Sequence, residues 1–197
     1  MNKLIFATHN QDKVVEIRSL LDKDFTILSL SESNIFIDIP EPYDTLEQNA
    51  IEKASVIYRL TNTACFAEDT GLEVNALHGE PGVRSARYAG EHKSFDDNIE
   101  KLLNNLKNTR DRSARFRTII CLIVDEKQHL FEGICNGTII SEKRGTNGFG
   151  YDPIFVPDGA TKTFAEMNLE EKNMFSHRKK AARKLMDYLE NLVPHIS

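Results

Sequence analysis

Residues 4–21 read LIFATHNQDKVVEIRSLL: a short apolar run, a polar bend, and then apolar residues at helical spacing. The apolar run is typical of a buried strand, which we expect over residues 3–7. The later spacing predicts an amphipathic helix with four inward positions, Val14, Ile17, Leu20 and Leu21. A strand that turns directly into a helix is a building unit of α/β proteins, and many of them hold a phosphate at its bend.

Strand and helix patterns alternate along most of the chain, and a β-hairpin pattern follows in its second half. Further strands are expected at residues 25–30, 64–67, 72–76, 114–124 and 129–140. Further helices are expected at residues 45–60, after Ser94, and at residues 176–192, where Leu185, Leu189 and Leu192 face inward. The pattern predicts an α/β fold with a mixed sheet flanked by helices, in one elongated domain over residues 1–197.

The composition narrows the class of protein. A net charge of −5 and a pI of about 5.7 favour neither a nucleic-acid nor a membrane partner, but they leave room for a small anion held by local cations. The three cysteines form no CxxC pair, which favours reduced thiols. Because the first apolar run is too short for a signal sequence or a membrane span, we expect a cytoplasmic protein.

The bend THNQDK, residues 8–13, is the first candidate for chemistry. The start of a helix offers free amide donors and the positive end of the helix dipole, and both favour an anion. Thr8 and Asn10 add side-chain donors, and Lys13 adds a positive charge. The alternative is a capped helix with a solvated lysine. The P-loop spacing G-x-x-x-x-G-K is absent from this stretch.

The second candidate is the acidic pair Glu68 and Asp69, which we expect to end the strand at residues 64–67. Open α/β sheets bind their ligands at such strand ends. Two adjacent carboxylates repel each other unless a cation or hydrogen bonds compensate them, and such hard oxygen ligands suit Mg²⁺. The alternative is that Asp69 only caps a helix or forms an Asx turn.

Two further stretches complete the set of candidates. The glycine-rich loop at residues 145–152 carries Phe149 and Tyr151, which could stack a nucleobase, or could simply be core aromatics of a turn. The last predicted helix opens with a basic run, His177 to Lys180, preceded by Lys172. Cations in a first helical turn oppose the helix dipole, so an anionic or electron-rich ligand explains them better than a solvated face does. Carboxylates, cations and a stacking loop together point to a nucleotide with several phosphates.

Five motifs resemble those of the HAM1-like inosine triphosphate pyrophosphatase family. They are FATHNQDK, AEDTGLEV, PGVRSARYAG, GFGYDPIF and SHR, which occur in the family's order from Thr8 to Arg178. The resemblance implies a mixed α/β fold of two lobes with the active site in the cleft between them, and a homodimer. It implies Mg²⁺-dependent hydrolysis of ITP, dITP and XTP to the monophosphate and pyrophosphate, which clears these nucleotides from the pool.

The resemblance also assigns roles to residues of this chain. Thr8, Asn10 and Lys13 would hold the phosphates, with Lys13 also catalytic. Asp69 would bind the metal and act as the base for the attacking water, and Thr70 would contact substrate. The base pocket would be lined by Phe149, Gly150, Tyr151 and Asp152. Recognition of the phosphates and of the 6-oxo face of the purine would be completed by Lys172, His177 and Arg178.

One position departs from the family pattern. The family places a metal-binding glutamate directly before the Asn-Ala of the second helix, and this chain has Gln48 there, with Glu47 one residue earlier. A step of one residue rotates a side chain by about 100° around a regular helix. We expect Glu47 to be the second metal ligand, with the amide oxygen of Gln48 as the alternative.

Two other functions stay open at this point. A non-catalytic nucleotide-binding protein would keep the pocket without the reaction, and the irregularity at Glu47 and Gln48 favours it. A pyrophosphatase of modified pyrimidine nucleotides would share the phosphate chemistry. Release of pyrophosphate, measured over a panel of nucleotides, separates the three.

Overall fold

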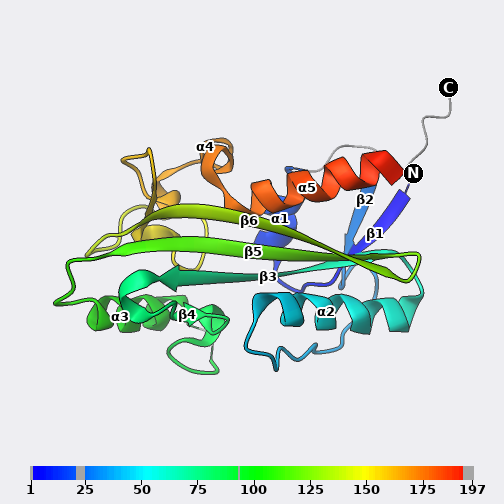
Figure 1. Ribbon diagram of the computed structural model, residues 1–197, viewed down its shortest axis with the longest axis horizontal. Coiled ribbons are helices and arrows are strands. Elements are labelled where there is room, and N and C mark those ends of the chain that lie inside the picture. Colours follow the sequence, from blue (N-terminus) through cyan, green and yellow to red (C-terminus); the bar gives the residue numbers. More distant parts are fainter. Residues whose placement is uncertain (1, 21–24, 93, 193–197) are drawn as a thin grey trace. The chain divides into compact units, whose positions relative to one another are not determined.

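The computed structural model describes residues 2–20, 25–92 and 94–192 (Figure 1). Its contacts divide the chain into two compact units. Unit 1 comprises residues 1–69, 118–133 and 178–197. Unit 2 comprises residues 70–117 and 134–177. Leu21, predicted to face inward from the first helix, lies outside the described residues.

The described strands form one seven-stranded sheet in the order β2-β1-β3-β5-β6-β7, with β4 paired to β3. The strands are β1 Asn2–Phe6, β2 Phe25–Ser29, β3 Cys65–Val74, β4 Pro81–Gly82, β5 Ser113–Val124, β6 Lys127–Ile139 and β7 Phe155–Pro157. Strand β1 pairs in parallel with β2 and β3, whereas β4 and β7 are antiparallel to their neighbours. The prediction of a mixed sheet is confirmed.

Five α-helices accompany the sheet in the described part of the chain. They are α1 Gln11–Arg18, α2 Leu46–Thr61, α3 Phe95–Asn105, α4 Leu169–Phe175 and α5 His177–Leu192. Short 3₁₀ helices lie at Asn75–Leu77, Ser85–Arg87, Asp152–Ile154 and Phe164–Glu166. The first four α-helices begin after a side chain that accepts a hydrogen bond from the first turn: Asn10, Thr45, Ser94 and Asn168.

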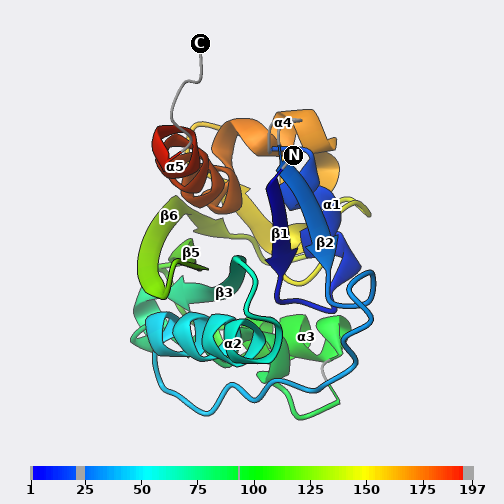
Figure 2. The ribbon, with the colours of Figure 1, turned by 90° about the vertical axis from the view of Figure 1, so that its right-hand side faces the viewer.

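The core of unit 1 follows the alternation of side chains along its strands. Phe66 belongs to the cluster that includes residues of α1 and α5, and its ring stacks on Phe6 with centroids 4.5 Å apart. Cys65, one residue earlier, points to the opposite face, where its thiol lies 3.3 Å from the Ala54 carbonyl of α2. Figure 2 shows α2 on one side of these strands and α1 and α5 on the other.

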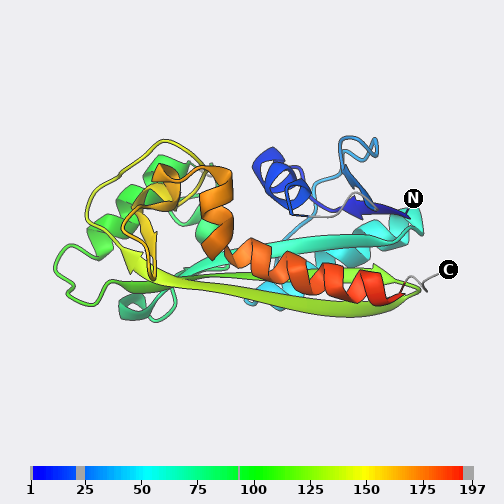
Figure 3. The same ribbon diagram turned by 90° about the horizontal axis from the view of Figure 1, so that it is seen from above.

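The hairpin of β5 and β6 turns through Asp125 and Glu126, which both have positive φ, of 48° and 63°. This is the backbone of a type I′ turn, whose twist matches that of the flanking strands. The predicted hairpin is confirmed, with a loop shorter than expected. Within unit 1, α5 runs along these strands (Figure 3), and Lys184 of α5 donates to the Glu132 carbonyl at 2.7 Å.

The core of unit 2 gathers apolar residues from both halves of its sequence. Leu72 and Val74 of β3 pack with Ile99 and Leu102 of α3. The same cluster contains the aromatic residues Phe116, Phe155 and Phe164. The predicted inward face of the helix after Ser94 is therefore confirmed.

Strand β3 corrects the sequence analysis. It is continuous over Cys65–Val74, so the expected strand ending at Glu68 and the separate strand at residues 72–76 are wrong. Extended backbone continues because both buried carboxylates have cationic partners, described below. Gly71 serves the pairing with β4 instead of a turn, since a Cβ there would lie 2.7 Å from the Gly82 carbonyl oxygen.

The C-terminal helix differs from its prediction in its first residue and in the burial of its last. Ser176 ends α4, a helix that the sequence analysis missed, and α5 begins at His177. Leu185 and Leu189 are buried as expected, but Leu192 is 44% exposed, so its inward placement is wrong. None of the described helices is both long enough and apolar enough to cross a bilayer.

Candidate active site

In the bend before α1, Thr8 and Asn10 are held by local hydrogen bonds. Asn10 caps the helix, because its Oδ1 accepts from the Lys13 amide at 3.2 Å. The hydroxyl oxygen of Thr8 accepts from the Asn10 amide at 3.2 Å. The cap expected as the alternative is therefore present. It does not exhaust either side chain, because a hydroxyl and a carboxamide can each still donate to an anion.

Lys13 leads into a buried ion cluster in unit 1, the Arg178 cluster, made of Lys13, Glu16, Glu68 and Arg178. Arg178 donates from Nε to Glu68 Oε2 and from Nη2 to Glu68 Oε1, both at 2.8 Å, and from Nη1 to Glu16. Lys13 Nζ lies 3.1 Å from Glu68 Oε1. Glu68 therefore shares one oxygen between a lysine of α1 and an arginine of α5.

The charges of this cluster fix its protonation state. Although burial alone would raise it, the pKa of the Glu68 carboxyl lies well below its usual range because Arg178 and Lys13 surround it. The carboxylates of Glu68 and Glu16 raise the pKa of Arg178 against the effect of burial. Glu68 and Arg178 are thus both charged at neutral pH, and this bidentate pair has the geometry of the strongest ion pairs.

The basic opening of α5 now has a structural explanation in part. Arg178 is 1% exposed and directs its guanidinium into the protein, onto Glu16 and Glu68. Lys179 and Lys180 are exposed. The run from His177 to Lys180 thus contains a buried histidine, a buried arginine with two carboxylate partners, and two exposed lysines.

Asp69 lies in a second ion cluster of unit 1, the Asp69 cluster, with Lys53 of α2 and Glu41. Lys53 Nζ lies 3.1 Å from Asp69 Oδ1 and also pairs with Glu41. The other oxygen of Asp69, Oδ2, is buried and accepts no hydrogen bond from any described residue. A buried carboxylate oxygen without a donor is costly unless a cation or water meets it.

The pKa values in the Asp69 cluster move upward. Burial raises the pKa of the Asp69 carboxyl, and Glu41 adds to that effect while Lys53 opposes it. The two carboxylates raise the pKa of Lys53, which burial alone would lower. Asp69 is therefore an undercompensated carboxylate with one oxygen available, which suits both a metal ligand and a proton acceptor.

No three His, Cys, Asp or Glu side chains gather into a ready-made metal site within residues 2–20, 25–92 and 94–192. Mg²⁺ does not need one, since it commonly binds through one or two carboxylates together with substrate phosphates. Glu47 lies half-buried in the first turn of α2, and the Gln48 side-chain oxygen accepts from the Thr45 hydroxyl at 3.0 Å. The second carboxylate that shares a partner with Asp69 is Glu41.

The predicted base pocket belongs to unit 2, where Asp152 organises the glycine-rich loop. Its Oδ2 accepts from the Phe149 amide at 3.0 Å and from Lys172 Nζ at 2.6 Å. Gly148 has φ +72°, and a Cβ there would lie 2.1 Å from Asp152 Oδ2, so the loop closes directly over this carboxylate. Lys172 Nζ lies 5.3 Å from the centroids of the Phe149 and Phe164 rings.

The members of this loop differ in their exposure. Tyr151 is buried, and its hydroxyl donates to the Ser85 carbonyl at 2.9 Å. Asp152 and Lys172 are also buried, whereas Phe149 and Gly150 are half-buried. Phe149 is therefore the more accessible aromatic ring of this loop, whereas Tyr151 fixes the loop to Ser85.

The last two predicted residues of unit 2 are Thr70 and His177. Thr70 is half-buried in β3. The His177 ring is buried and stacks on Phe116, with centroids 4.7 Å apart and an interplanar angle of 16°. A histidine held flat against an aromatic ring has a fixed ring plane, which is an advantage for contacting a ligand in one orientation.

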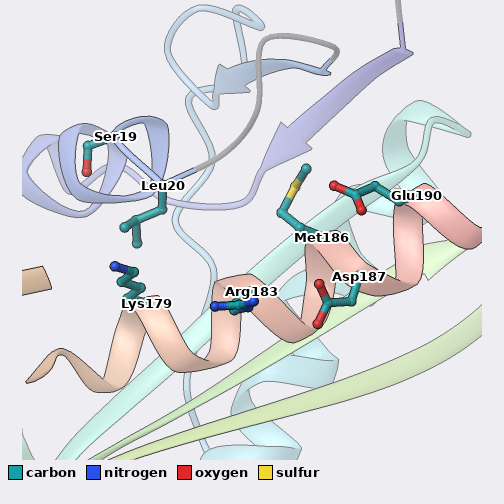
Figure 4. Close-up of a pocket in the computed structure, with 7 residues that line it drawn as sticks. All are labelled: Ser19, Leu20, Lys179, Arg183, Met186, Asp187 and Glu190. Atoms are coloured by element: carbon teal, nitrogen blue, oxygen red, sulfur yellow. The ribbon is translucent and has the colours of Figure 1, made fainter. Parts of the chain in front are cut away.

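A cavity of about 480 Å³ lies in unit 1 (Figure 4). It is lined by two residues that follow α1 and by five residues of α5: Ser19, Leu20, Lys179, Arg183, Met186, Asp187 and Glu190. Among these, Lys179 is the one member of the predicted basic run, and none of the residues with an assigned role lines the cavity, so we do not assign it to the candidate site.

Three charged residues of the two clusters escaped the sequence analysis: Glu16, Glu41 and Lys53. A signal was available for two of them. Lys53 falls on the apolar side of α2 between Ala50 and Ala54, and Glu16 falls between the buried positions of α1. A charge inside an apolar stripe must be paired, because an isolated buried charge is prohibitively costly. Glu41, in a loop, gave no comparable signal.

Comparison with known proteins agrees with the motifs. Residues 4–188 match the sequence profile of the Ham1 family. The dITP/XTP pyrophosphatase of Flavobacterium johnsoniae is 55% identical over 187 residues, which are 95% of this chain and 97% of that protein. The dITP/XTP pyrophosphatase of Porphyromonas gingivalis is 52% identical over 190 residues, 96% of this chain and 98% of that protein.

Solved structures give the same result. The Staphylococcus aureus Ham1 protein superposes with a TM-score of 0.88 at 41% identity, covering 98% of this chain and all of that one. A nucleoside-triphosphatase, dITP/XTP pyrophosphatase, from Mycobacterium abscessus superposes with a TM-score of 0.74 at 36% identity, over 98% of this chain and 99% of that one. In sequence and in fold, this chain is a member of the Ham1 family.

Proposed function

We propose that this protein is a Mg²⁺-dependent pyrophosphatase that hydrolyses dITP, XTP and ITP to the monophosphate and pyrophosphate. The observation that carries the proposal is Asp69, a buried carboxylate with a raised pKa and one oxygen that accepts no hydrogen bond from the described residues. The names of the relatives, dITP/XTP pyrophosphatase, support the substrate class. The alternatives are a non-catalytic nucleotide-binding protein and a pyrophosphatase of modified pyrimidine nucleotides.

The residues around Asp69 fit a magnesium ion. Asp69 Oδ2 offers an oxygen ligand, and Glu41 is the carboxylate that shares Lys53 with it. We propose Asp69 and Glu41 as the protein ligands, with Glu47 as the alternative second ligand. When bound, Mg²⁺ would supply charge neutralisation on the phosphate oxygens.

The chain's own groups account for the remaining chemistry. The carboxylate of Asp69 accepts a proton from the attacking water, whose oxygen forms a bond to the α-phosphorus as the bond to the bridging oxygen of the β-phosphate breaks. Pyrophosphate leaves with that oxygen. Lys13 offsets negative charge on the phosphates, and Thr8 and Asn10 donate hydrogen bonds to them. Positioning and electrostatics therefore supply most of the acceleration.

Base recognition is proposed for the loop that Asp152 organises. The half-buried ring of Phe149 would stack the purine, a contact worth about 1–3 kcal/mol for a base on an aromatic side chain. Lys172 holds Asp152, so we propose that it keeps the loop in place as well as adding positive charge. Arg178 stays the proposed reader of the 6-oxo group, and in this structure it also donates to Glu16 and Glu68.

The test is pyrophosphate release measured with Mg²⁺ over dITP, XTP, ITP, ATP, dUTP and a methylated pyrimidine triphosphate. We expect turnover of the 6-oxo purines well above all others, and its loss when the metal is chelated with EDTA and its return when Mg²⁺ is added back. Binding of dITP without pyrophosphate release would establish the non-catalytic alternative. A preference for the methylated pyrimidine triphosphate would establish a pyrophosphatase of modified pyrimidine nucleotides.

The working form of the enzyme is part of the proposal. We propose a cytoplasmic homodimer, on the resemblance to the family and on the chemistry of the cysteines. Cys65, Cys121 and Cys135 are all buried free thiols, as a reducing compartment favours. Sedimentation at micromolar concentration should give about twice the chain mass of 22.4 kDa, and a monomer mass would overturn the dimer alone.

A further inference from the structure

We propose that Glu16 is a positioning residue of this enzyme, acting on Lys13 through Arg178 and Glu68. The inference rests on the proposed function, because it concerns how the enzyme prepares its phosphate-binding lysine. Glu16 lies three residues after Lys13 on α1, outside the five motifs named above.

The contacts form a closed path within unit 1. Lys13 and Glu16, at positions i and i+3 of α1, lie on neighbouring parts of the helix surface. Lys13 contacts Glu68 at 3.1 Å, Glu68 is bound bidentately by Arg178, and Arg178 donates back to Glu16. One turn of α1 is therefore fixed to β3 and α5 at two charged points.

Exposure separates Lys13 from the other three groups. The side chains of Glu68, Arg178 and Glu16 are 0%, 2% and 8% exposed, whereas that of Lys13 is 18% exposed. Lys13 is thus the member of the Arg178 cluster that an incoming phosphate can reach. The three buried side chains fix the position of the Lys13 ammonium group.

Glu16 acts by compensating part of the positive charge of Arg178, which also pairs with Glu68. Glu68 Oε1 accepts from Arg178 Nη2 at 2.8 Å and from Lys13 at 3.1 Å, so the two cations share one oxygen. With Glu16 present, part of the Arg178 charge is compensated elsewhere, and Glu68 keeps negative charge for Lys13. Without the charge of Glu16, Arg178 draws more strongly on Glu68, and Lys13 loses its anchor.

The first variant to test is Glu16→Gln, which keeps the size and the acceptor oxygen while removing the charge. A misplacement of a catalytic group by about 1 Å can cost about 10²-fold in rate, and we expect a fall of that order in kcat/KM for dITP. The matched control is Glu100→Gln, since Glu100 is an exposed acid of α3, and its activity should stay at the wild-type level.

A double-mutant cycle distinguishes positioning from a purely structural role. Lys13→Met removes the group on which Glu16 is proposed to act. If the proposal holds, adding Glu16→Gln to Lys13→Met leaves kcat/KM at the value of Lys13→Met alone. If Glu16 only stabilises the fold, the two losses multiply, and urea unfolding shows the same penalty in both backgrounds. That result would overturn the proposal.

Two additions keep the test decisive. Should Glu16→Gln fail to fold, Glu16→Asp replaces it in the cycle, because it keeps the charge but withdraws it by one methylene. The cycle is also run on the binding of Mg²⁺–pyrophosphate by calorimetry. If the wild type binds pyrophosphate but hydrolyses no nucleotide, the proposed function fails and the binding cycle still decides the role of Glu16. If the wild type does neither, both are overturned.

Discussion

Glu68 and Asp69 are neighbours in β3 with the same charge and opposite surroundings. Successive side chains of a strand point to opposite faces, so Glu68 meets Arg178 and Lys13, while Asp69 meets Lys53. The pKa of Glu68 is lowered by its two cations, whereas burial raises the pKa of Asp69. Glu68 is thus paired within the fold, whereas Asp69 is the carboxylate for which we propose a role in the chemistry.

The opposite pKa shifts predict opposite effects on stability. A carboxyl whose pKa is lowered by folding stabilises the protein above its unfolded pKa and loses that contribution as the pH falls through the folded value. Glu68→Gln should therefore lower the free energy of unfolding at pH 7, by about 3–5 kcal/mol, because it leaves buried Arg178 undercompensated. Urea unfolding measures it, and a neutral effect would contradict the role of the Arg178 cluster.

Asp69→Asn should shift stability the other way. Because its pKa is raised by folding, charged Asp69 destabilises the native state at neutral pH, and protonation relieves this as the pH falls through the folded pKa. Removing the charge should raise the free energy of unfolding by about 1 kcal/mol at pH 7, a gain of the kind seen when a strained functional group is removed. A loss of stability larger than that of Glu68→Gln would show that Asp69 is structural.

The same substitution should abolish turnover. Loss of a general base lowers kcat by about 10²–10⁴-fold, whereas dITP binding with Mg²⁺, measured by calorimetry, should weaken by much less, because the asparagine side chain keeps an oxygen that can still face the ion. Since the base acts deprotonated and its pKa is raised, wild-type kcat/KM should fall on the acid side at a higher pH than an ordinary aspartate gives. Asp158→Asn, at an exposed position, is the control. Wild-type turnover in Asp69→Asn would refute the assignment of the base.

The strands and helices show which physical signals a sequence carries. Apolar periodicity and caps are local, so β1, β2, α2, α3 and the hairpin were predictable. The middle of β3 was not, because the charge of Glu68 is compensated by Arg178, 110 positions later in the chain. Helix α4 had a local signal, the capping box of Asn168 and Glu171, but its seven residues are too short for an apolar stripe.

In the candidate site, too, local features were predictable from the sequence and long-range contacts were not. Residues within the motifs, such as Lys13, Asp69 and Asp152, could be named from residue type and spacing. Their partners could not, since the contacts of Lys53 with Asp69 and of Lys172 with Asp152 depend on how elements distant in the sequence pack together. The sequence therefore indicated which groups carry charge, while the fold decides which of these charges are already paired.

The glycine-rich loop offers a matched pair of substitutions. Gly148 and Gly150 both have positive φ, of 72° and 61°, but only Gly148 faces an obstacle, Asp152 Oδ2, which a Cβ would approach to 2.1 Å. Asp152 cannot yield, because Lys172 and the Phe149 amide hold it. Gly150→Ala should lower the free energy of unfolding by about 1–2 kcal/mol from backbone strain alone.

Gly148→Ala should lower the free energy of unfolding by the same backbone strain and by about 1–3 kcal/mol more, because the new methyl group clashes with Asp152. It should also weaken dITP binding, because the clash moves the Phe149 ring. Thermal unfolding and calorimetric titration measure the two effects. Equal stability losses in the two variants would contradict the close contact between Gly148 and Asp152.

The full chain has a negative net charge, and neither ion cluster of the candidate site carries an excess of positive charge. The Arg178 cluster contains two cations and two carboxylates, and in the Asp69 cluster one lysine faces two carboxylates. Neither group attracts a polyanion by excess positive charge. A triphosphate that brings its own Mg²⁺ would suit such a site, because the proposed ion would meet the Asp69 carboxylate and Lys13 would meet the phosphates.

Because neither cluster carries excess positive charge, we predict that substrate and metal raise the free energy of unfolding only when both are bound. Because the proposed activity would consume dITP, the measurement uses a non-hydrolysable dITP analogue with Mg²⁺. At a hundredfold excess over Kd, binding adds about 2.7 kcal/mol to the free energy of unfolding. For a chain of this size that corresponds to a rise in Tm of about 5–10 °C.

The analogue without Mg²⁺, and the corresponding ATP analogue with it, should both give much smaller rises at the same concentration. An equal rise with the ATP analogue would place purine discrimination after binding, in the chemical step. An undiminished rise without metal would show that Lys13 and its neighbours hold the phosphates unaided, and the assignment of Asp69 as a magnesium ligand would fall.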